Sequence, residues 1–174
     1  MKYLLAADFH GNIEAYAELK RVADEVQPDA VVLLGDLCDA SGAQPVNNVL
    51  DRIFYPILAV RGNCDYPDVF SSLNLGGRDV SFMEEIEGKR VFFSHGHVYG
   101  RANVPGVLGK GDVLFYGHYH VPEIVRQKYG VWLVCVGSAG RPGGGSAPTY
   151  CLFDGFSVQI RHLYTDEIIM ETRL

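Results

Sequence analysis

Two kinds of apolar pattern alternate in the first 60 residues of the chain. Short continuous apolar runs are typical of buried strands, and apolar residues spaced three or four apart are typical of helices that bury one face. The runs predict strands at 2–7, 30–34 and 57–60, and the spacing predicts helices at 13–26 and 46–53, the second opened by Pro45. This alternation predicts parallel strands joined by right-handed crossovers.

The second half of the chain changes to pairs of apolar runs separated by turn residues. Three of these pairs flank Glu87-Gly88-Lys89, Tyr129-Gly130 and Asp154-Gly155, which are typical of tight hairpins. The predicted strands are 80–86, 90–93, 113–116, 124–128, 131–136, 149–153 and 157–164. A parallel first half and an antiparallel second half predict two sheets packed face to face, with helices outside.

Length and charge narrow the classes of protein to consider. A chain of 174 residues predicts a single domain, residues 1–174. The net charge of −6 argues against strong nucleic-acid binding and against binding to membrane surfaces. We expect no membrane span and a cytoplasmic location, because the apolar runs are short and Asp8 interrupts the first one too early for a signal sequence. The four cysteines form no CxxC pair and are expected to be reduced.

Side chains able to bind metals follow five of the predicted strands. They are Asp8 and His10, Asp36, Asn63, His95, and His118 and His120. Since ligands gather outside the carboxyl ends of strands in open α/β sheets, we expect these side chains to meet at one site. Alternate residues such as Asp8 and His10 can face the same site if the backbone there stays extended. Each motif alone is weak, because an Asp-x-His is more often a cap beside a surface histidine; the set together favours a metal centre.

The candidate set also indicates which metals to expect. Four imidazoles, two carboxylates and one amide oxygen exceed the needs of one tetrahedral ion but suit two ions that share a carboxylate. The imidazole content disfavours calcium and magnesium and favours manganese, iron, cobalt, nickel or zinc. A two-metal centre suits in-line displacement at phosphorus. Two divalent ions would also outweigh the charges of Asp8 and Asp36, so the site can bind phosphate in an acidic protein.

These motifs, in this order over residues 8–120, resemble those of the calcineurin-like metallophosphoesterases, and most closely their small, single-domain phosphodiesterase branch. The resemblance implies an α/β fold, a four-layer α-β-β-α sandwich of two mixed sheets flanked by helices. It implies two divalent transition-metal ions, expected to be Mn²⁺ with Ni²⁺, Fe²⁺, Co²⁺ or Zn²⁺ as alternatives. In that family pattern Asp36 bridges the ions, Asp8, His10 and His120 bind one, and Asn63, His95 and His118 bind the other.

The function implied is that of a phosphodiesterase, in which a metal-bridging hydroxide attacks a small phosphodiester in line. The expected catalytic residues are Asp36, Asn63, His95 and His97. Many relatives carry a histidine after the Gly-Asn motif, where this chain has Cys64. The enzyme then depends on an acidic leaving group or on another proton donor, for which His97 is the candidate; the alternative is that His97 only packs the loop.

Several other residues admit both a functional and a structural interpretation. Cys64 and Arg61 are expected to contact substrate, and Arg61 and Arg141 to clamp its phosphate, although a surface position explains either arginine. Asn12 and Asp65 are candidates to support metal ligands, and helix capping explains them equally well.

Two other functions share this set of motifs. One is a phosphomonoesterase with the same site, and the other is a catalytically silent scaffold resembling the retromer subunit of the superfamily. All four candidate histidine ligands are present, which favours a working site over the scaffold. Specificity is expected to come from the loops at 66–79 and 99–112. The antiparallel edges predict a homodimer or homotetramer.

Overall fold

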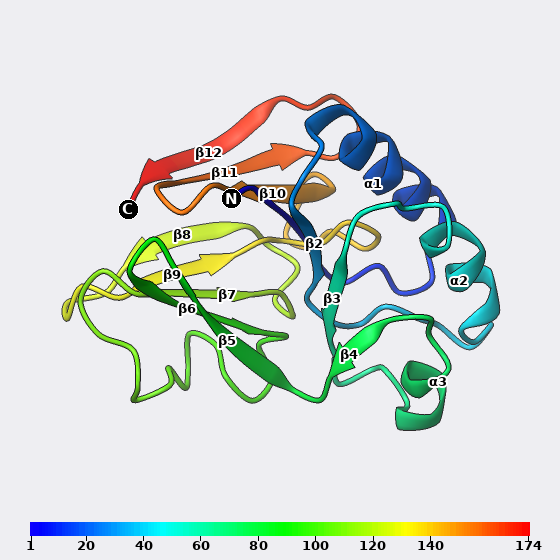
Figure 1. The fold of residues 1–174 in the computed structure, drawn as a ribbon, viewed down its shortest axis with the longest axis horizontal. Helices are drawn as coiled ribbons and strands as arrows, with labels where there is room; N and C mark the ends of the chain where they lie inside the picture. The colour runs from blue at the N-terminus through cyan, green and yellow to red at the C-terminus, as the bar shows by residue number, and fades with distance from the viewer.

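The first 60 residues form the alternating strands and helices that the pattern predicts (Figure 1). The structure is a computed structural model that describes residues 1–174, apart from the side chains of residues 76–78. The elements are β1 (Tyr3–Ala6), α1 (Ile13–Val26), β2 (Ala30–Leu33), α2 (Gln44–Leu50) and β3 (Ile57–Val60). Asn12 caps α1, because its side-chain oxygen accepts a hydrogen bond from the N–H of Ala15.

Both sheets are mixed, which confirms the fold class. The seven-stranded sheet has the order β12-β11-β10-β1-β2-β3-β4, and the five-stranded sheet has the order β5-β6-β7-β9-β8. The remaining strands are β4 (Gly76–Arg78), β5 (Ser81–Ile86), β6 (Lys89–Ser94), β7 (Val113–Tyr116), β8 (Glu123–Arg126), β9 (Trp132–Cys135), β10 (Thr149–Phe153), β11 (Ser157–His162) and β12 (Ile168–Arg173). Pairing of the exposed edges between copies of the chain stays a prediction.

The expected division into a parallel first half and an antiparallel second half is wrong. The C-terminal strands return to the first sheet, where β10 pairs antiparallel with β1 and places Phe153 opposite Tyr3. In the second sheet β6, β7 and β9 are parallel. Hairpin turns set only local pairing, so the sequence pattern did not reveal which sheet each hairpin joins.

The segment 66–79, expected as a loop, contains the short helix α3 (Pro67–Ser71) and β4. Within the predicted loop 66–79, the side chains of residues 76–78 lie outside the part of the chain that the structure describes. The five-residue helix is too short to show a helical period, and β4 is a Gly-Gly-Arg segment that joins the sheet by pairing with β3.

The strand β1 is buried on both faces, which explains its continuous apolar run. Leu4 and Ala6 pack toward the helices, while Tyr3, Leu5 and Ala7 pack between the two sheets. Aromatic rings fill the space between the sheets: the Phe93 ring centroid lies 4.7 Å from that of Phe82 and 5.7 Å from that of Phe115. The two sheets therefore share one apolar interior.

The outer cover of the five-stranded sheet differs from the expected helical layer. The described helices α1, α2 and α3 pack on the seven-stranded sheet. Leu114, Tyr116 and Leu133 on the outer face of the other sheet pack instead against irregular chain around Val104 and Leu108. The buried carboxylate of Asp112 anchors that segment by accepting hydrogen bonds from the N–H groups of Arg90 and Gly109. The layer that covers the outer face of the five-stranded sheet is thus an irregular loop anchored by Asp112.

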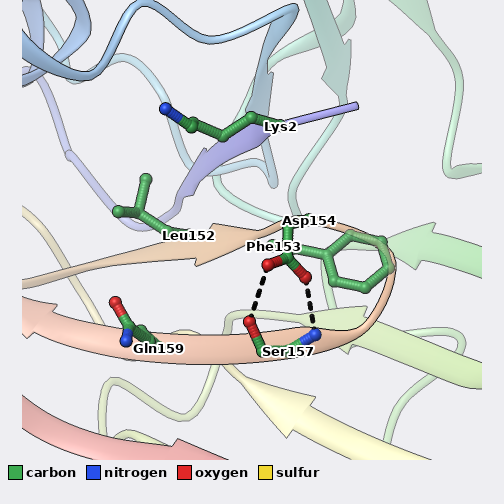
Figure 2. Close-up of a pocket in the computed structure, with 6 residues that line it drawn as sticks. All are labelled: Lys2, Leu152, Phe153, Asp154, Ser157 and Gln159. Carbon is green, nitrogen blue, oxygen red and sulfur yellow. Dashed lines mark hydrogen bonds between the residues drawn. The ribbon is translucent and has the colours of Figure 1, made fainter. Parts of the chain in front are cut away.

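The β10–β11 hairpin shows how a predicted turn is stabilised (Figure 2). The Asp154 carboxylate accepts hydrogen bonds from the N–H of Ser157 at 2.6 Å and from its hydroxyl at 2.9 Å, and Gly155 takes a φ of +91°. A pocket of about 160 Å³ lies on this hairpin, lined by Lys2, Leu152, Phe153, Asp154, Ser157 and Gln159. Of the polar residues that line this pocket, Asp154 and Ser157 are therefore used by the turn.

Replacing Phe93 with alanine should destabilise the fold by about 3–5 kcal/mol, because it empties the space between the sheets. Urea-induced unfolding followed by circular dichroism measures this change. Phe54→Ala is the matched control: Phe54 is 86% exposed, so its removal should change stability by less than about 0.5 kcal/mol. Equal effects of the two substitutions would contradict the assignment of the core.

Candidate metal centre

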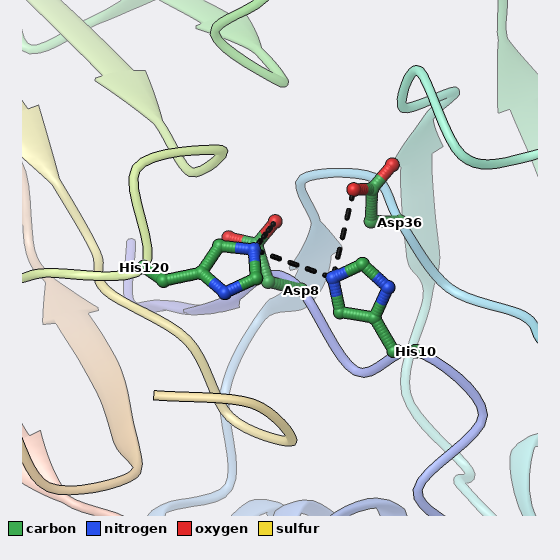
Figure 3. Close-up of side chains that lie close together, drawn as sticks. All are labelled: Asp8, His10, Asp36 and His120. Carbon is green, nitrogen blue, oxygen red and sulfur yellow. Dashed lines mark hydrogen bonds and ion pairs between the residues drawn. The ribbon is translucent and has the colours of Figure 1, made fainter. Parts of the chain in front are cut away.

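The loops that follow β1, β2, β3, β6 and β7 bring the candidate ligands together, as the sequence predicts. Figure 3 shows four of these side chains facing a common point: Asp8, His10, Asp36 and His120. One ligand atom from each lies within 4.8 Å of the others, so the four groups could hold a metal ion. The carboxylates of Asp8 and Asp36 are buried, and the two imidazoles are half-buried at the mouth of the site.

The local backbone differs from the extended form expected for Asp8 and His10 and for His118 and His120. Five of the seven candidate ligands have a positive φ between 46° and 69°: Asp8, His10, Asp36, His118 and His120. This left-handed region costs about 1 kcal/mol or more for a side chain other than glycine, although aspartate and histidine tolerate it better than most. Each strand end therefore turns sharply, and the turns direct the side chains into the site.

Asp36 occupies the middle of the site, with one carboxylate oxygen toward each half. Its Oδ2 lies 3.6 Å from Nε2 of His10, and its Oδ1 lies 3.4 Å from Nε2 of His95. Asn63 joins the second half, because its Oδ1 lies 3.0 Å from the same nitrogen of His95. The His118 ring packs edge-on against His95 with centroids 5.1 Å apart. This arrangement has two groups of ligands on either side of one carboxylate.

Backbone carbonyls fix the orientation of two imidazoles. Nδ1 of His95 lies 2.8 Å from the Leu34 oxygen, and Nδ1 of His120 lies 2.6 Å from the Arg141 oxygen. A carbonyl oxygen only accepts hydrogen bonds, so Nδ1 is the donor in each ring. In the neutral rings Nε2 then carries a lone pair, and it points into the site. This is the tautomer that metal-binding histidines adopt.

The inward-facing atoms are mainly acceptors without matching donors. Nε2 of His95 faces the Asn63 oxygen, whose amide nitrogen is turned away and donates to Sγ of Cys64. Oδ1 of Asp8 is buried and accepts no hydrogen bond from the described residues. Buried acceptors that face one another are costly unless a cation or proton lies between them. The donor set therefore fits metal binding.

A layer of hydrogen bonds holds the ligand loops in place. Asp65, which the sequence left open as a cap or a support, accepts from the N–H groups of Leu37 and Gly62 and so joins the loops after β2 and β3. The Ser138 hydroxyl donates to the Asp8 carbonyl oxygen at 2.8 Å. Asn12 caps α1, as one of its two interpretations predicts, and its amide donates to the Gly140 oxygen rather than to a candidate ligand.

Two glycines permit the close approach of these loops. A Cβ placed on Gly62 would overlap the Asp36 carboxylate, and one placed on Gly117 would lie 2.7 Å from Oδ2 of Asp8. The backbone at these points is packed directly against the two buried carboxylates. Any side chain at either position would displace a candidate ligand.

The buried carboxylates and the histidines of the site shift one another's pKa values. Burial alone would raise the pKa of Asp36, but His95 and the N–H of Cys64 hold that pKa well below its usual range. Burial lowers the pKa of His95, yet Asp36 and Asp8 outweigh it and leave the pKa above its ordinary value. The Asp8 carboxylate raises the pKa of His120. Burial lowers the pKa of His10 and of His118.

His97 and Cys64, the candidate proton donor and a candidate substrate contact, occupy different surroundings. His97 lies beside the second group of ligands, with its ring centroid 5.3 Å from that of His95, and its buried Nδ1 lacks a partner among the described residues. Burial lowers the pKa of His97. Cys64 is exposed at the rim, and its N–H donates to Oδ1 of Asp36. Burial of part of the thiol, followed by Asp36, raises the pKa of Cys64 to about 11.

The two candidate arginines make contacts of their own. Arg61 is paired with Asp79, since its Nε and Nη2 lie 3.2 and 3.1 Å from the same carboxylate oxygen. Arg141 is exposed, and its contribution to the site is the carbonyl oxygen that orients His120. Sequence reasoning missed that contribution, as well as that of Leu34, because a carbonyl oxygen is common to every residue. A substrate contact by either guanidinium stays a prediction.

Comparisons with known proteins agree with this geometry. A family model for the calcineurin-like phosphoesterase superfamily domain matches residues 1–155. The phosphodiesterase YfcE of Escherichia coli K12 is 28% identical over 183 residues, covering 100% of this chain and 98% of YfcE. The solved structure of YfcE, a phosphoesterase from E. coli, has a TM-score of 0.89 and covers 99% of both chains. Vacuolar Protein Sorting 29 from Cryptosporidium parvum shares the fold, with 16% identity, a TM-score of 0.64 and coverage of 99% of this chain and 98% of its own.

Replacing Gly62 with alanine should weaken Mn²⁺ binding by about ten-fold or more, because the new methyl group displaces the Asp36 carboxylate. Isothermal titration calorimetry measures the affinity, and thermal unfolding checks that the variant is folded. Gly106→Ala serves as the control, since a Cβ there meets nothing within 4 Å. Unchanged Mn²⁺ affinity in folded Gly62→Ala would show that Asp36 does not bind the ion.

Proposed function

The chain belongs to the calcineurin-like phosphoesterase superfamily, and on this basis we propose that it is a metal-dependent phosphodiesterase acting on small phosphodiesters. The family inferred from the motifs is confirmed, and the chain is homologous to hydrolases. YfcE, with which it aligns over 100% of its length, is named a phosphodiesterase. None of the helices that the structure describes is long and apolar enough to cross a membrane.

One observation carries the proposal: the two oxygens of Asp36 face two separate groups of metal-binding side chains. A carboxylate in this position can bridge two ions. We assign Asp8, His10, Asp36 and His120 to one ion, and Asp36, Asn63, His95 and His118 to the other. The imidazole-rich set favours Mn²⁺, with Ni²⁺, Fe²⁺, Co²⁺ or Zn²⁺ as alternatives. Two bound metal ions would lower the pKa of a coordinated water toward about 7 and offset the negative charge of the phosphate.

The chain's own residues would then position the substrate. The Leu34 carbonyl and the Asp36 carboxylate fix the His95 ring. From this fixed position, His95 would help to orient the phosphate while it serves as a metal ligand. His97 lies beside it, with ring centroids 5.3 Å apart, and is our candidate proton donor to the leaving group. Burial lowers the pKa of His97 and so favours the neutral imidazole, which is the weaker acid, so an acidic leaving group is still favoured. Cys64 and Arg61 follow β3 at the rim of the site, where they would contact the substrate.

The presence of Cys64 after Gly62-Asn63 favours diesters with acidic leaving groups. A thiol has an ordinary pKa near 8.5, whereas an imidazolium near 6.5 is the stronger acid at neutral pH. A leaving group that is already a stable anion needs no proton. A separate measurement distinguishes the diesterase from a phosphomonoesterase: p-nitrophenyl phosphate and bis(p-nitrophenyl) phosphate share a leaving group, so the ratio of their rates reports the preference for mono- or diester.

Asp36→Asn should lower metal-dependent hydrolysis of bis(p-nitrophenyl) phosphate by at least about 100-fold, because the amide keeps the shape but removes the bridging charge. Release of p-nitrophenolate with added Mn²⁺ measures the rate, and elemental analysis measures bound metal. Asp154→Asn, at the hairpin turn outside the site, is the control. Equal rates for wild type and Asp36→Asn would refute the proposed function, and a folded wild type that binds no Mn²⁺ would favour the scaffold.

Cys64→His should raise the rate with alkyl diesters more than with aryl diesters, since only poor leaving groups need a proton. The expected gain with an alkyl diester is about ten-fold or more, which is the low end of general acid catalysis. Cys64→Ser controls for loss of the thiol without gain of an imidazole. A Cys64→His variant that has wild-type rates on both classes of diester would contradict the leaving-group argument.

A further inference from the structure

A second cavity is lined by chain neighbours of the candidate ligands His118 and His120. It has a volume of about 280 Å³ and is lined by Arg101, Tyr119, Val121, Pro122, Glu123 and Cys135. Tyr119 lies between the candidate ligands His118 and His120, and its ring is edge-on to His118 with centroids 5.2 Å apart. The cavity is therefore one residue away from the metal centre along the chain.

The walls of the cavity are continuations of the two loops that carry histidine ligands. The loop after β6 runs from His95 through a tight reversal, in which Gly100 pairs with Asn103, and this places Arg101 in the wall. A Cβ on Gly100 would lie 2.7 Å from the Gly96 oxygen, so the loop folds closely back on itself. The loop after β7 and the first residue of β8 supply the adjoining wall, Tyr119, Val121, Pro122 and Glu123. The same backbone thus shapes both the metal centre and the cavity.

The lining offers a flat surface and an acceptor. The Arg101 guanidinium lies 4.0 Å from the centroid of the Tyr119 ring, which is a cation–π stack. Glu123 lies across from it: its Oε2 is 3.4 Å from the Tyr116 hydroxyl, which donates, and 3.9 Å from Nη1 of Arg101. Both described contacts of this carboxylate use Oε2, so Oε1 is available to accept from a ligand. Val121 and Pro122 add apolar surface.

We propose that this cavity is a subsite for a planar ring bearing an N–H donor, namely the nucleobase of a nucleoside phosphodiester. The inference rests on the proposed function, since it names the organic group that the diester carries. The ring would stack beside Arg101 and Tyr119 and donate to Glu123. A free anion fits less well, because Glu123 offsets the charge of Arg101. The volume holds one ring system rather than a polymer, in keeping with the net charge of −6.

Two other cavities lack these features. The pocket in Figure 2 lies on the β10–β11 hairpin, and its aspartate is used by the turn. A cavity at the turn of the β8–β9 hairpin is lined by Lys110, Arg126, Lys128 and Tyr129, among others, and lies at the opposite end of the strands from the ligand loops. That second region supplies a control, because Arg126 also lies over an aromatic ring, 5.4 Å from the centroid of Trp132.

The kinetic test compares two diesters with the same leaving group, thymidine 5′-(p-nitrophenyl) phosphate and methyl p-nitrophenyl phosphate. The ratio of their kcat/KM values reports binding of the nucleoside. Arg101→Ala should lower this ratio about ten-fold, through KM of the thymidine ester, since the base loses the group on which it stacks. Glu123→Ala should lower it about three-fold or more by removing the acceptor. Arg126→Ala should leave the ratio unchanged.

A binding measurement separates failure of this inference from failure of the proposed function. Thymidine is titrated into protein without added metal, and chemical shift changes at Tyr119 are followed by NMR. We expect saturable binding in wild type and Arg126→Ala that is lost in Arg101→Ala. If neither ester is hydrolysed but this binding pattern holds, the subsite stands and the phosphodiesterase is refuted. If hydrolysis occurs with a ratio that Arg101→Ala does not change, or if thymidine does not bind, the subsite is refuted.

Discussion

The structure is organised around a cluster of buried acceptors that needs positive charge. Asp8 and Asp36 are 0% and 2% exposed, and neither lies beside a lysine or arginine among the contacts that the structure describes. Their partners are histidines and backbone N–H groups, and where a carbonyl holds Nδ1, the neutral ring presents a lone pair at Nε2. Two adjacent carboxylates in such surroundings repel each other unless a cation lies between them. Metal binding would therefore stabilise this fold as well as supply its chemistry.

This requirement explains why so much of the backbone near the site is strained or glycine. Five candidate ligands adopt left-handed φ values, and glycines at Gly62 and Gly117 let neighbouring loops reach the carboxylates. Such strain is kept when the surrounding contacts determine the conformation. Here Asp65 and Ser138 supply those contacts, because they join the loops to one another through backbone groups. Loops joined in this way would hold each ligand in place before any ion binds, which would limit the entropy lost on binding.

The sequence predicted the elements better than their connections. Strand ends such as Asp8 and Asp36 could be assigned to one site because parallel strands share an edge at their carboxyl ends. The left-handed backbone at those residues could not, since the same dipeptides occur in extended chain. Hairpin turns were recognisable from Asp154-Gly155, but the return of β10 to β1 depends on pairing between residues about 150 positions apart. The loop cover around Val104 and the carbonyl partner of His120 left no signal in side-chain identity.

An acidic protein can still be selective for anions when its cationic groups are few and fixed. The net charge of −6 disfavours polyanions at long range, while a metal pair would attract a single phosphate at short range. Selectivity among phosphodiesters would then come from contacts with the uncharged organic group, which charge complementarity cannot recognise. The cavity beside Tyr119 has this character, since Arg101 and Glu123 largely offset each other. Because its walls continue the loops that carry His95 and His118, a substitution there would alter specificity while the ligand geometry is held by Leu34 and Asp8. Reactivity and recognition would therefore share loops but depend on different contacts.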